Sequence, residues 1–268
     1  AYATKASDLS GKNEDNTDNI NKILINKQRL ANLLGFSNYA SMALTTKMAN
    51  SSKEVIAFLD DLANKAKPFA SKDMTDLINY GHKLNINDIE AWDIAYLSEK
   101  IKEERFNYSE QEIKSYFPDH KVIDGLFKVV ENIYGIFINK EIAEVWHKDV
   151  KFYKITNKSG GLIGYFYLDL YARKSKRGGA WMDEAISKFK FNNEAAHPVA
   201  YLTCNFSEPV HNNVSLLTHD EVITLFHEFG HGLHHLLTEI NDYGVSGIQG
   251  VEWDAVELPS QFMENFCW

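Results

Sequence analysis

The chain has 268 residues, of which 44% are hydrophobic and 24% charged, and it contains only two cysteines. This is the composition of an ordinary globular protein, and it excludes wholesale disorder, collagen, coiled coils and a disulfide-rich secreted fold. Lys and Arg number 28 against 37 Asp and Glu, which gives a net charge of −9. Because general binders of nucleic acid or of anionic membranes carry the opposite charge, we expect neither partner.

The apolar segments and the two ends of the chain bear on its location. No apolar run approaches the roughly 18 residues of a membrane span, and the first residues, AYATKASDLSGKNEDNTDN, lack the apolar segment of a signal peptide. With so few cysteines, we expect a reducing, cytoplasmic setting. The chain starts with Ala and stops at Trp268 inside a predicted helix. We therefore expect an internal piece of a longer protein, incomplete at both ends, whose missing remainder is a partner.

Helices are predicted over the first half of the chain. The spacing of apolar residues indicates one helix that ends near Gly35, one that runs from the capping-box pair Ser51 and Glu54 to Pro68, and one that ends at Gly135. We expect their apolar faces to pack into a core. These faces comprise Ile20, Ile23, Leu24, Ala31 and Leu34; Val55, Phe58, Leu59, Leu62 and Ala66; and Val122, Leu126, Val129, Val130 and Ile133.

Strands are predicted after residue 150. KFYKIT and LIGYFYLDLY are rich in aromatic and β-branched residues and flank NKSGG, which indicates a hairpin with a longer loop. PVAYLTCNF (198–206) predicts a further strand. We therefore predict a helical region over 1–149 and a mixed region over 150–268. The expected fold is mainly α with a small antiparallel β-sheet, of the α+β class.

The most informative segment is THDEVITLFHEFGHGLHHLL, where Thr218 and Glu221 form a second capping box at the start of a predicted amphipathic helix. Within it, residues 227–231 match the pattern H-E-x-x-H. Four residues correspond to about 6 Å of rise and about 40° of rotation on a helix, so His227 and His231 can reach one metal ion. Glu228 can lie beside that ion without binding it.

This pattern suits hydrolysis of a peptide bond. A zinc ion with three protein ligands keeps one position for water, lowers the pKa of that water to about 7 and polarises the scissile carbonyl. Glu228 is the candidate base that takes the proton from water and delivers it to the leaving amine. We expect one Zn²⁺, although cobalt or manganese would suit the same ligands. His234 and His235 follow the motif, and we expect His234 to orient the ligands from behind them.

The third ligand is expected in WDAVELPSQFMENFCW, which predicts a second helix. Asp254, Glu257, Gln261 and Glu264 form a polar stripe on it, and such a stripe is either a solvated face or a metal-binding one. The neighbouring aromatic residues predict that this helix is largely buried, and buried carboxylates need a partner such as a dication. We choose the central Glu257 as the ligand and expect Asp254, one turn earlier, to orient a ligating histidine.

Several segments together resemble peptidase family M3, the zinc oligopeptidases of the thimet oligopeptidase and bacterial oligopeptidase A group. The segments are HEFGHGLHHLL, GVSGIQGVEWDAVELPSQFMENFCW, WDIAYLSEK, FYLDLYARKSKRGGAWM and PVAYLTCNF. The pattern VSGI-G-V-WDAVELPSQFMEN resembles the bacterial oligopeptidase A branch in particular. The resemblance implies a zincin-like core in which His227, His231 and Glu257 are zinc ligands and Glu228 is the catalytic glutamate. Asp254 matches an acidic position behind the ligands.

The family cleaves short peptides internally, in a deep channel between two mostly helical lobes. The resemblance covers only part of the family pattern: we expect the family's leading lobe, and the substrate-contacting tyrosine and histidine residues that follow the second helix, to lie outside this sequence. We therefore expect a zinc-dependent metalloendopeptidase of short oligopeptides whose isolated piece binds zinc but cleaves peptides poorly. Two alternatives stay open: a non-catalytic, zinc-stabilised helical module for binding or assembly, and hydrolysis of another amide.

Two segments are candidates for substrate binding. PVAYLTCNF is expected to be an edge strand beside the zinc helix, where a peptide adds as a further strand along Ala200, Tyr201 and Leu202; the alternative is an interior strand. The basic loop 173–179, RKSKRGG, is either a solvated turn or a flexible loop that closes over bound peptide through Gly178 and Gly179.

Overall fold

The computed structural model describes residue 9 and residues 15–192, 194–209 and 214–268. Much of the polar start of the chain therefore lies outside the described residues. The chain divides into two compact units, Ala1–Ser109 and Glu110–Trp268. The predicted boundary between 149 and 150 falls inside the second unit and stays a prediction. None of the helices in the described segments combines the length and apolar character that a membrane span requires.

The first unit is helical, with α1 (Thr17–Leu33), α2 (Tyr39–Ala43), η1 (Leu44–Thr46), α3 (Ser52–Lys83) and α4 (Asp93–Phe106). The Ser51 side chain caps α3 by accepting a hydrogen bond from the Glu54 backbone N–H at 3.2 Å. The prediction that this helix ends at Pro68 was wrong, because α3 continues through Pro68 for 15 more residues. A proline removes one hydrogen bond of the helix, and the other turns of this 32-residue helix maintain it.

The predicted apolar faces of α1 and α3 are largely exposed, with Ala31 as the buried exception, which corrects the expectation that they pack into a core. Ile20, Leu24 and Leu62 are each more than half exposed, and Phe58 is 64% exposed. The helices of this unit pack in pairs, α1 with α2 and α3 with α4. Such pairs form no second layer that could cover a whole helix face, and Ala31 and Leu97 are the fully buried apolar residues of the described part of this unit.

The second unit contains a five-stranded sheet in the order β1-β2-β3-β7-β4. Its strands are β1 (Ile136–Glu141), β2 (Lys151–Asn157), β3 (Leu162–Tyr171), β4 (Trp181–Ile186) and β7 (Val199–Phe206), and β5 (Phe189–Phe191) pairs with β6 (Glu194–Ala196) in a separate hairpin. The predicted hairpin of β2 and β3 is confirmed. The expected antiparallel sheet is a mixed one: β1–β2, β2–β3 and β4–β7 pair antiparallel, whereas β3 and β7 run parallel.

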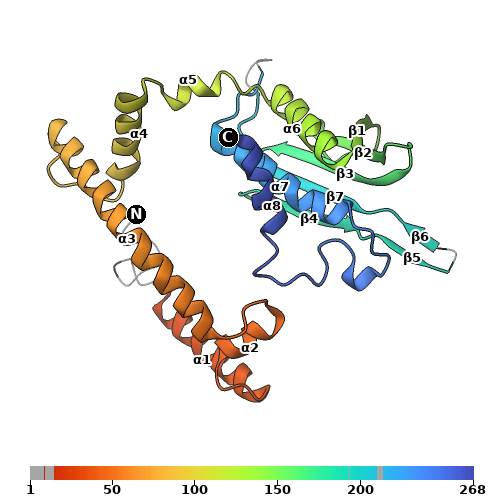
Figure 1. The fold of residues 1–268 in the computed structure, drawn as a ribbon, viewed down its shortest axis with the longest axis horizontal. Coiled ribbons are helices and arrows are strands. Elements are labelled where there is room, and N and C mark those ends of the chain that lie inside the picture. Colours follow the sequence, from red (N-terminus) through yellow and green to blue (C-terminus); the bar gives the residue numbers. More distant parts are fainter. Residues whose placement is uncertain (1–8, 10–14, 193, 210–213) are drawn as a thin grey trace. The chain divides into compact units, whose positions relative to one another are not determined.

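This unit also contains helices α5 (Glu110–Lys114), α6 (Asp119–Tyr134) and α7 (His219–Leu236), and α6 and α7 lie beside the sheet (Figure 1). The predicted core face of α6 is largely confirmed, because Val122, Leu126 and Val130 are buried, and the helix ends at Gly135 with φ +65°. The Phe127 ring lies 5.0 Å from that of Tyr153 on β2 and 5.8 Å from that of Phe229 on α7. The two long helices therefore share one face of the sheet, which we call the inner face.

Strand β7 is an interior strand, so the prediction of an edge strand was wrong. Thr203 pairs with Asp169 on β3 and with Trp181 on β4, which occupies both sides of β7. Ala200 and Leu202 are buried against the helices, and no edge of β7 is available to a peptide. The edge strand beside α7 is β4, whose register with β7 is antiparallel.

The second predicted helix is shorter than expected. α8 spans Leu258–Glu264 and is followed by η3 (Asn265–Cys267), while 253–257 form turns and Glu257 is the residue that precedes the helix. Pro259 lies in the first turn of α8, where its missing N–H costs nothing. The expected burial was wrong as well: α8 packs on α7 through Ser260 and Met263, whereas the flanking aromatic residues Trp253, Phe262, Phe266 and Trp268 are exposed.

Candidate metal centre

Helix α7 begins at the predicted capping box, which is confirmed. The Thr218 side chain accepts from the Glu221 N–H at 3.1 Å, and the Glu221 carboxylate accepts from the Thr218 N–H at 2.8 Å. These two bonds satisfy backbone donors that the first turn of a helix leaves free. His227 and His231 follow on adjacent turns with ring centroids 5.0 Å apart. The helix thus presents both imidazoles on one side.

Gly230 allows α8 to approach that side of α7. A Cβ atom at this position would lie 2.5 Å from the Pro259 carbonyl oxygen and 2.6 Å from the Ser260 Cα. No real side chain tolerates such contacts, so the two helices touch through bare backbone. This close contact brings Glu257, at the start of α8, to the two histidines.

The three predicted ligands lie together. The Nε2 atoms of His227 and His231 are each 3.1 Å from the same carboxylate oxygen of Glu257. Zinc bonds of about 2.0–2.1 Å in tetrahedral geometry separate neighbouring ligand atoms by about 3.3 Å, so this donor set fits a zinc ion. The side chain of Glu257 is 50% exposed, which leaves the group open toward solvent.

The protonation states also suit a cation. Burial acts to raise the pKa of Glu257, but the hydrogen bond from Ser260 Oγ at 2.8 Å and the two histidines outweigh it and hold that pKa below its ordinary value. Burial lowers the pKa of His231, so its imidazole is neutral near pH 7 and its Nε2 lone pair is available.

Glu264 contacts His227 on the side of the imidazole ring opposite Glu257. Its carboxylate lies 2.7 Å from Nδ1 of His227, 37 residues away in sequence. With the proton on Nδ1, His227 donates to Glu264 and keeps its Nε2 lone pair for a metal. The sequence placed Glu264 on the polar stripe without this role. The signal was its position two helical turns after Glu257, which puts both carboxylates on the side of α8 that meets α7.

Asp254 and His234, predicted to orient the ligands, lie outside the three-residue group. Asp254 is exposed, and His234 lines a separate cavity with Tyr134 and Leu237. His235 is fully buried, and its Nε2 lies 2.9 Å from the Ile186 carbonyl oxygen. Neither His234 nor His235 joins the ligand group found among the described residues, so the roles of Asp254 and His234 stay predictions.

Glu228 points into the same cavity as the ligand group. This cavity, of about 350 Å³, is lined by both histidines, Glu228, Glu257 and the edge-strand residues Trp181 and Met182. Burial raises the pKa of Glu228 to about 7; the charge of Glu257 adds to this, while His227 and the Met182 backbone N–H oppose it. A buried carboxyl beside three candidate ligands can accept and return a proton.

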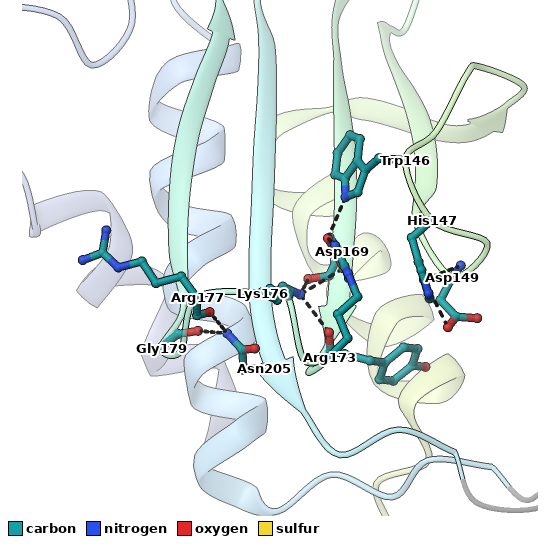
Figure 2. A network of polar contacts seen from close by, with 10 residues as sticks. Trp146, His147, Asp149, Asp169, Arg173, Lys176, Arg177, Gly179 and Asn205 are labelled. Atoms are coloured by element: carbon teal, nitrogen blue, oxygen red, sulfur yellow. Dashed lines mark hydrogen bonds and ion pairs between the residues drawn. The ribbon is translucent and has the colours of Figure 1, made fainter.

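The basic loop 173–179 is anchored to the sheet rather than solvated throughout (Figure 2). Both Nη atoms of Arg173 donate to the Asp169 carboxylate, at 2.8 and 2.7 Å, and Lys176 Nζ donates to its Oδ1 at 2.9 Å. Trp146 Nε1 donates to the same carboxylate at 3.0 Å. Burial opposes ionisation, but these donors outweigh it and lower the pKa of Asp169 to about 2. The sequence contained no signal for this anchor.

The far end of the loop is held as well. Asn205 Nδ2 donates to the carbonyl oxygens of Arg177 and Gly179 at 2.7 and 2.6 Å. Gly179 has φ +95°, a conformation that favours glycine, and β4 begins two residues later. The loop therefore sets where the edge strand starts, and whether it closes over a peptide stays a prediction.

The fold and the site together define a candidate hydrolytic metal centre of the H-E-x-x-H class. A family model described as Peptidase family M3 matches residues 1–268, and the chain belongs to this family. It is 51% identical over its whole length to oligopeptidase A of Escherichia coli and spans 40% of that protein. It is 35% identical to saccharolysin of Saccharomyces cerevisiae and 33% identical to dipeptidyl carboxypeptidase of Escherichia coli, with 90% and 92% of this chain covered and 36% of each relative.

Proposed function

We propose that the chain carries the catalytic centre of a zinc-dependent metalloendopeptidase that hydrolyses short oligopeptides. The observation that carries this proposal is the shared contact of two imidazoles with one oxygen of Glu257, beside the buried Glu228. Membership of a peptidase family and similarity to proteins named oligopeptidase A support it. A zincin-like core is part of this proposal.

Each residue has a distinct role in the proposed reaction. His227, His231 and Glu257 would hold one Zn²⁺, which when bound polarises the scissile carbonyl and acidifies a water molecule. The carboxylate of Glu228 would accept a proton from the attacking water and return it to the leaving amine. Glu264 fixes the tautomer of His227. We keep Asp254 and His234 as proposed orienting residues.

The proposed place for the substrate is the outer edge of β4, which pairs with no further strand among the described residues and replaces the edge expected on β7. Trp181 and Met182 of this strand line the metal cavity, so a peptide paired with β4 passes the ligand group. Gly178 and Gly179 lie three and two residues before the first residue of the strand, Trp181. Among the residues first expected to bind substrate, Ala200 and Leu202 are buried, which favours β4 over β7 for this role.

The alternative, a non-catalytic zinc module, requires a filled coordination sphere. Two features argue for the catalytic proposal instead: Glu257 is half exposed, and neither His234 nor His235 reaches the ligand group in the described part of the chain. The chain spans 40% of oligopeptidase A, and we propose that the parent's remaining residues complete the substrate channel. A reducing cytoplasmic location is part of the proposal, supported by the free thiols of Cys204 and Cys267.

Metal content and turnover of a quenched fluorogenic peptide, measured on the same sample, test the proposal. We expect one zinc per chain, slow cleavage by this chain and faster cleavage by a longer version of the protein. Glu228→Gln should keep the zinc and lose turnover by at least about 100-fold, the contribution typical of a general base. Full turnover by Glu228→Gln, or metal that survives replacement of both histidines, would sink the proposal.

A further inference from the structure

A second cavity lies across β4 from the metal centre, on the outer face of the sheet. Two rows of paired residues cross that face, Asp169–Thr203–Trp181 and Tyr167–Tyr201–Asp183. Trp146 covers them, with its ring 5.2 Å from Tyr167 and 5.5 Å from Tyr201. The cavity has a volume of about 370 Å³, and the loop 173–177 forms its remaining wall.

The charges around this cavity are unequal. Arg173, Lys176 and Arg177 line it together with the carboxylates of Asp169 and Asp183, an excess of one positive charge on a chain with net charge −9. Asp169 already holds Arg173 and Lys176, and the Lys176 side chain is only 4% exposed. These two cations serve the anchor, so they do not provide a free site for an anion.

Arg177 is the cation that remains. Its Cζ lies 6.0 Å from the ring centroid of Trp181, the first residue of the edge strand. Within the described parts of the chain, its guanidinium forms no ion pair with a carboxylate. Figure 2 shows its side chain extending away from Asp169, while its backbone is tied to Asn205. A guanidinium on a fixed backbone, held over an aromatic ring, is organised in advance to receive an anion.

The register of the sheet relates this pair to the proposed substrate. Successive side chains of an extended strand point to opposite faces, so a peptide along β4 directs every second side chain to the outer face with Trp181, a residue that borders both the outer cavity and the metal cavity. The others point to the inner face with Met182 and the metal helix. We propose that the Arg177–Trp181 pair binds a carboxylate of a peptide that lies along β4, either an acidic side chain or the C-terminal carboxylate. This inference rests on the proposed function for the position of the peptide.

Equilibrium binding to the Glu228→Gln variant tests the pair without cleavage. The probes are fluorescein-labelled, acetylated hexapeptides of three kinds. In the first, a single Glu is placed at each position in turn and the C-terminus is amidated. The second has Gln in place of Glu and an amidated C-terminus, and the third has Gln and a free C-terminal carboxylate. We expect one carboxylate peptide to bind about threefold to fivefold more tightly than the amidated Gln peptide, as for a partly exposed ion pair. A Glu at the adjacent position, facing the inner side, should give no gain.

Substitutions assign the effect to Arg177. Arg177→Gln should remove the preference for the carboxylate peptide, and Arg177→Lys should retain part of it. The control Lys174→Gln removes the same charge from an exposed residue of the same loop that does not line the cavity, and it should keep the preference. The inference is overturned if no carboxylate peptide is preferred, if none of the peptides binds, or if the two Gln variants behave alike. Cleavage by the unsubstituted chain is scored separately, so a failure of the peptidase proposal is distinguishable.

Discussion

Replacing Gly230 with alanine should disrupt the candidate metal centre without touching any ligand. The added Cβ would lie 2.5 Å from the Pro259 carbonyl oxygen, where ordinary van der Waals contact begins at 3.4 Å, so α8 must move by about 0.9 Å. Because backbone lies on both sides of this contact, no side-chain rotation can relieve it. Glu257 precedes α8 directly and would move with it.

The expected magnitudes follow from two opposing effects. Alanine in place of glycine within a helix favours folding by up to about 1 kcal/mol, whereas overpacking of a tight contact costs about 1–3 kcal/mol. We therefore expect a net loss of about 1 kcal/mol in the free energy of unfolding. The larger effect falls on metal binding, since a displaced Glu257 no longer meets both Nε2 atoms, and we expect about 10- to 100-fold weaker binding of zinc.

Competition with a chromophoric chelator measures the zinc affinity, and urea denaturation measures the stability. Gly125→Ala is the matched control, because Gly125 lies in the middle of α6 with nothing within 4 Å of the added Cβ. This control should be slightly more stable and should bind zinc as the unsubstituted chain does. If Gly230→Ala binds zinc with unchanged affinity, the argument that bare helix contact positions Glu257 is refuted.

Two further substitutions test the surroundings of the site. Glu264→Ala should weaken zinc binding by about 10-fold or more by freeing Nδ1 of His227, while Glu264→Gln, which can still accept that bond, should have a smaller effect; equal affinities in a chelator competition would contradict this role. Asp169→Asn should lower the free energy of unfolding by about 3 kcal/mol at pH 7, because Arg173 and Lys176 lose their buried partner. The pKa of Asp169 falls from 3.8 in the unfolded chain to about 2 in the folded one. Above pH 4, its ionisation therefore contributes about 2 kcal/mol to the free energy of unfolding, partly offset by the burial of Lys176. This contribution is lost as the pH falls through 2. Urea denaturation at pH 7, 4 and 3 should show that the difference in the free energy of unfolding between Asp169→Asn and the unsubstituted chain shrinks as the pH falls. A difference that stays constant would count against the ion pair.

The features predicted correctly from sequence are those set by neighbours along the chain. The capping box of Thr218 and Glu221, the end of α6 at Gly135 and the hairpin of β2 and β3 each depend on a few adjacent residues. The histidine pair of α7 belongs here too, since helical geometry alone places residues 227 and 231 on one side. Pro68 misled the prediction because a long helix can absorb the loss of one hydrogen bond.

The sequence by itself thus determined the local elements, the metal-binding pattern on α7 and the likeness to a peptidase family. Only the tertiary structure decided that β7 is an interior strand and β4 the edge strand, and that α8 packs against α7 at Gly230. It also decided that Glu264 bonds to His227 and that Asp169 bonds to Arg173. These are contacts between segments far apart in the chain. Strand order and helix contact depend on which surfaces meet in three dimensions, and alternation along a single strand is the same whether its edges are paired or free.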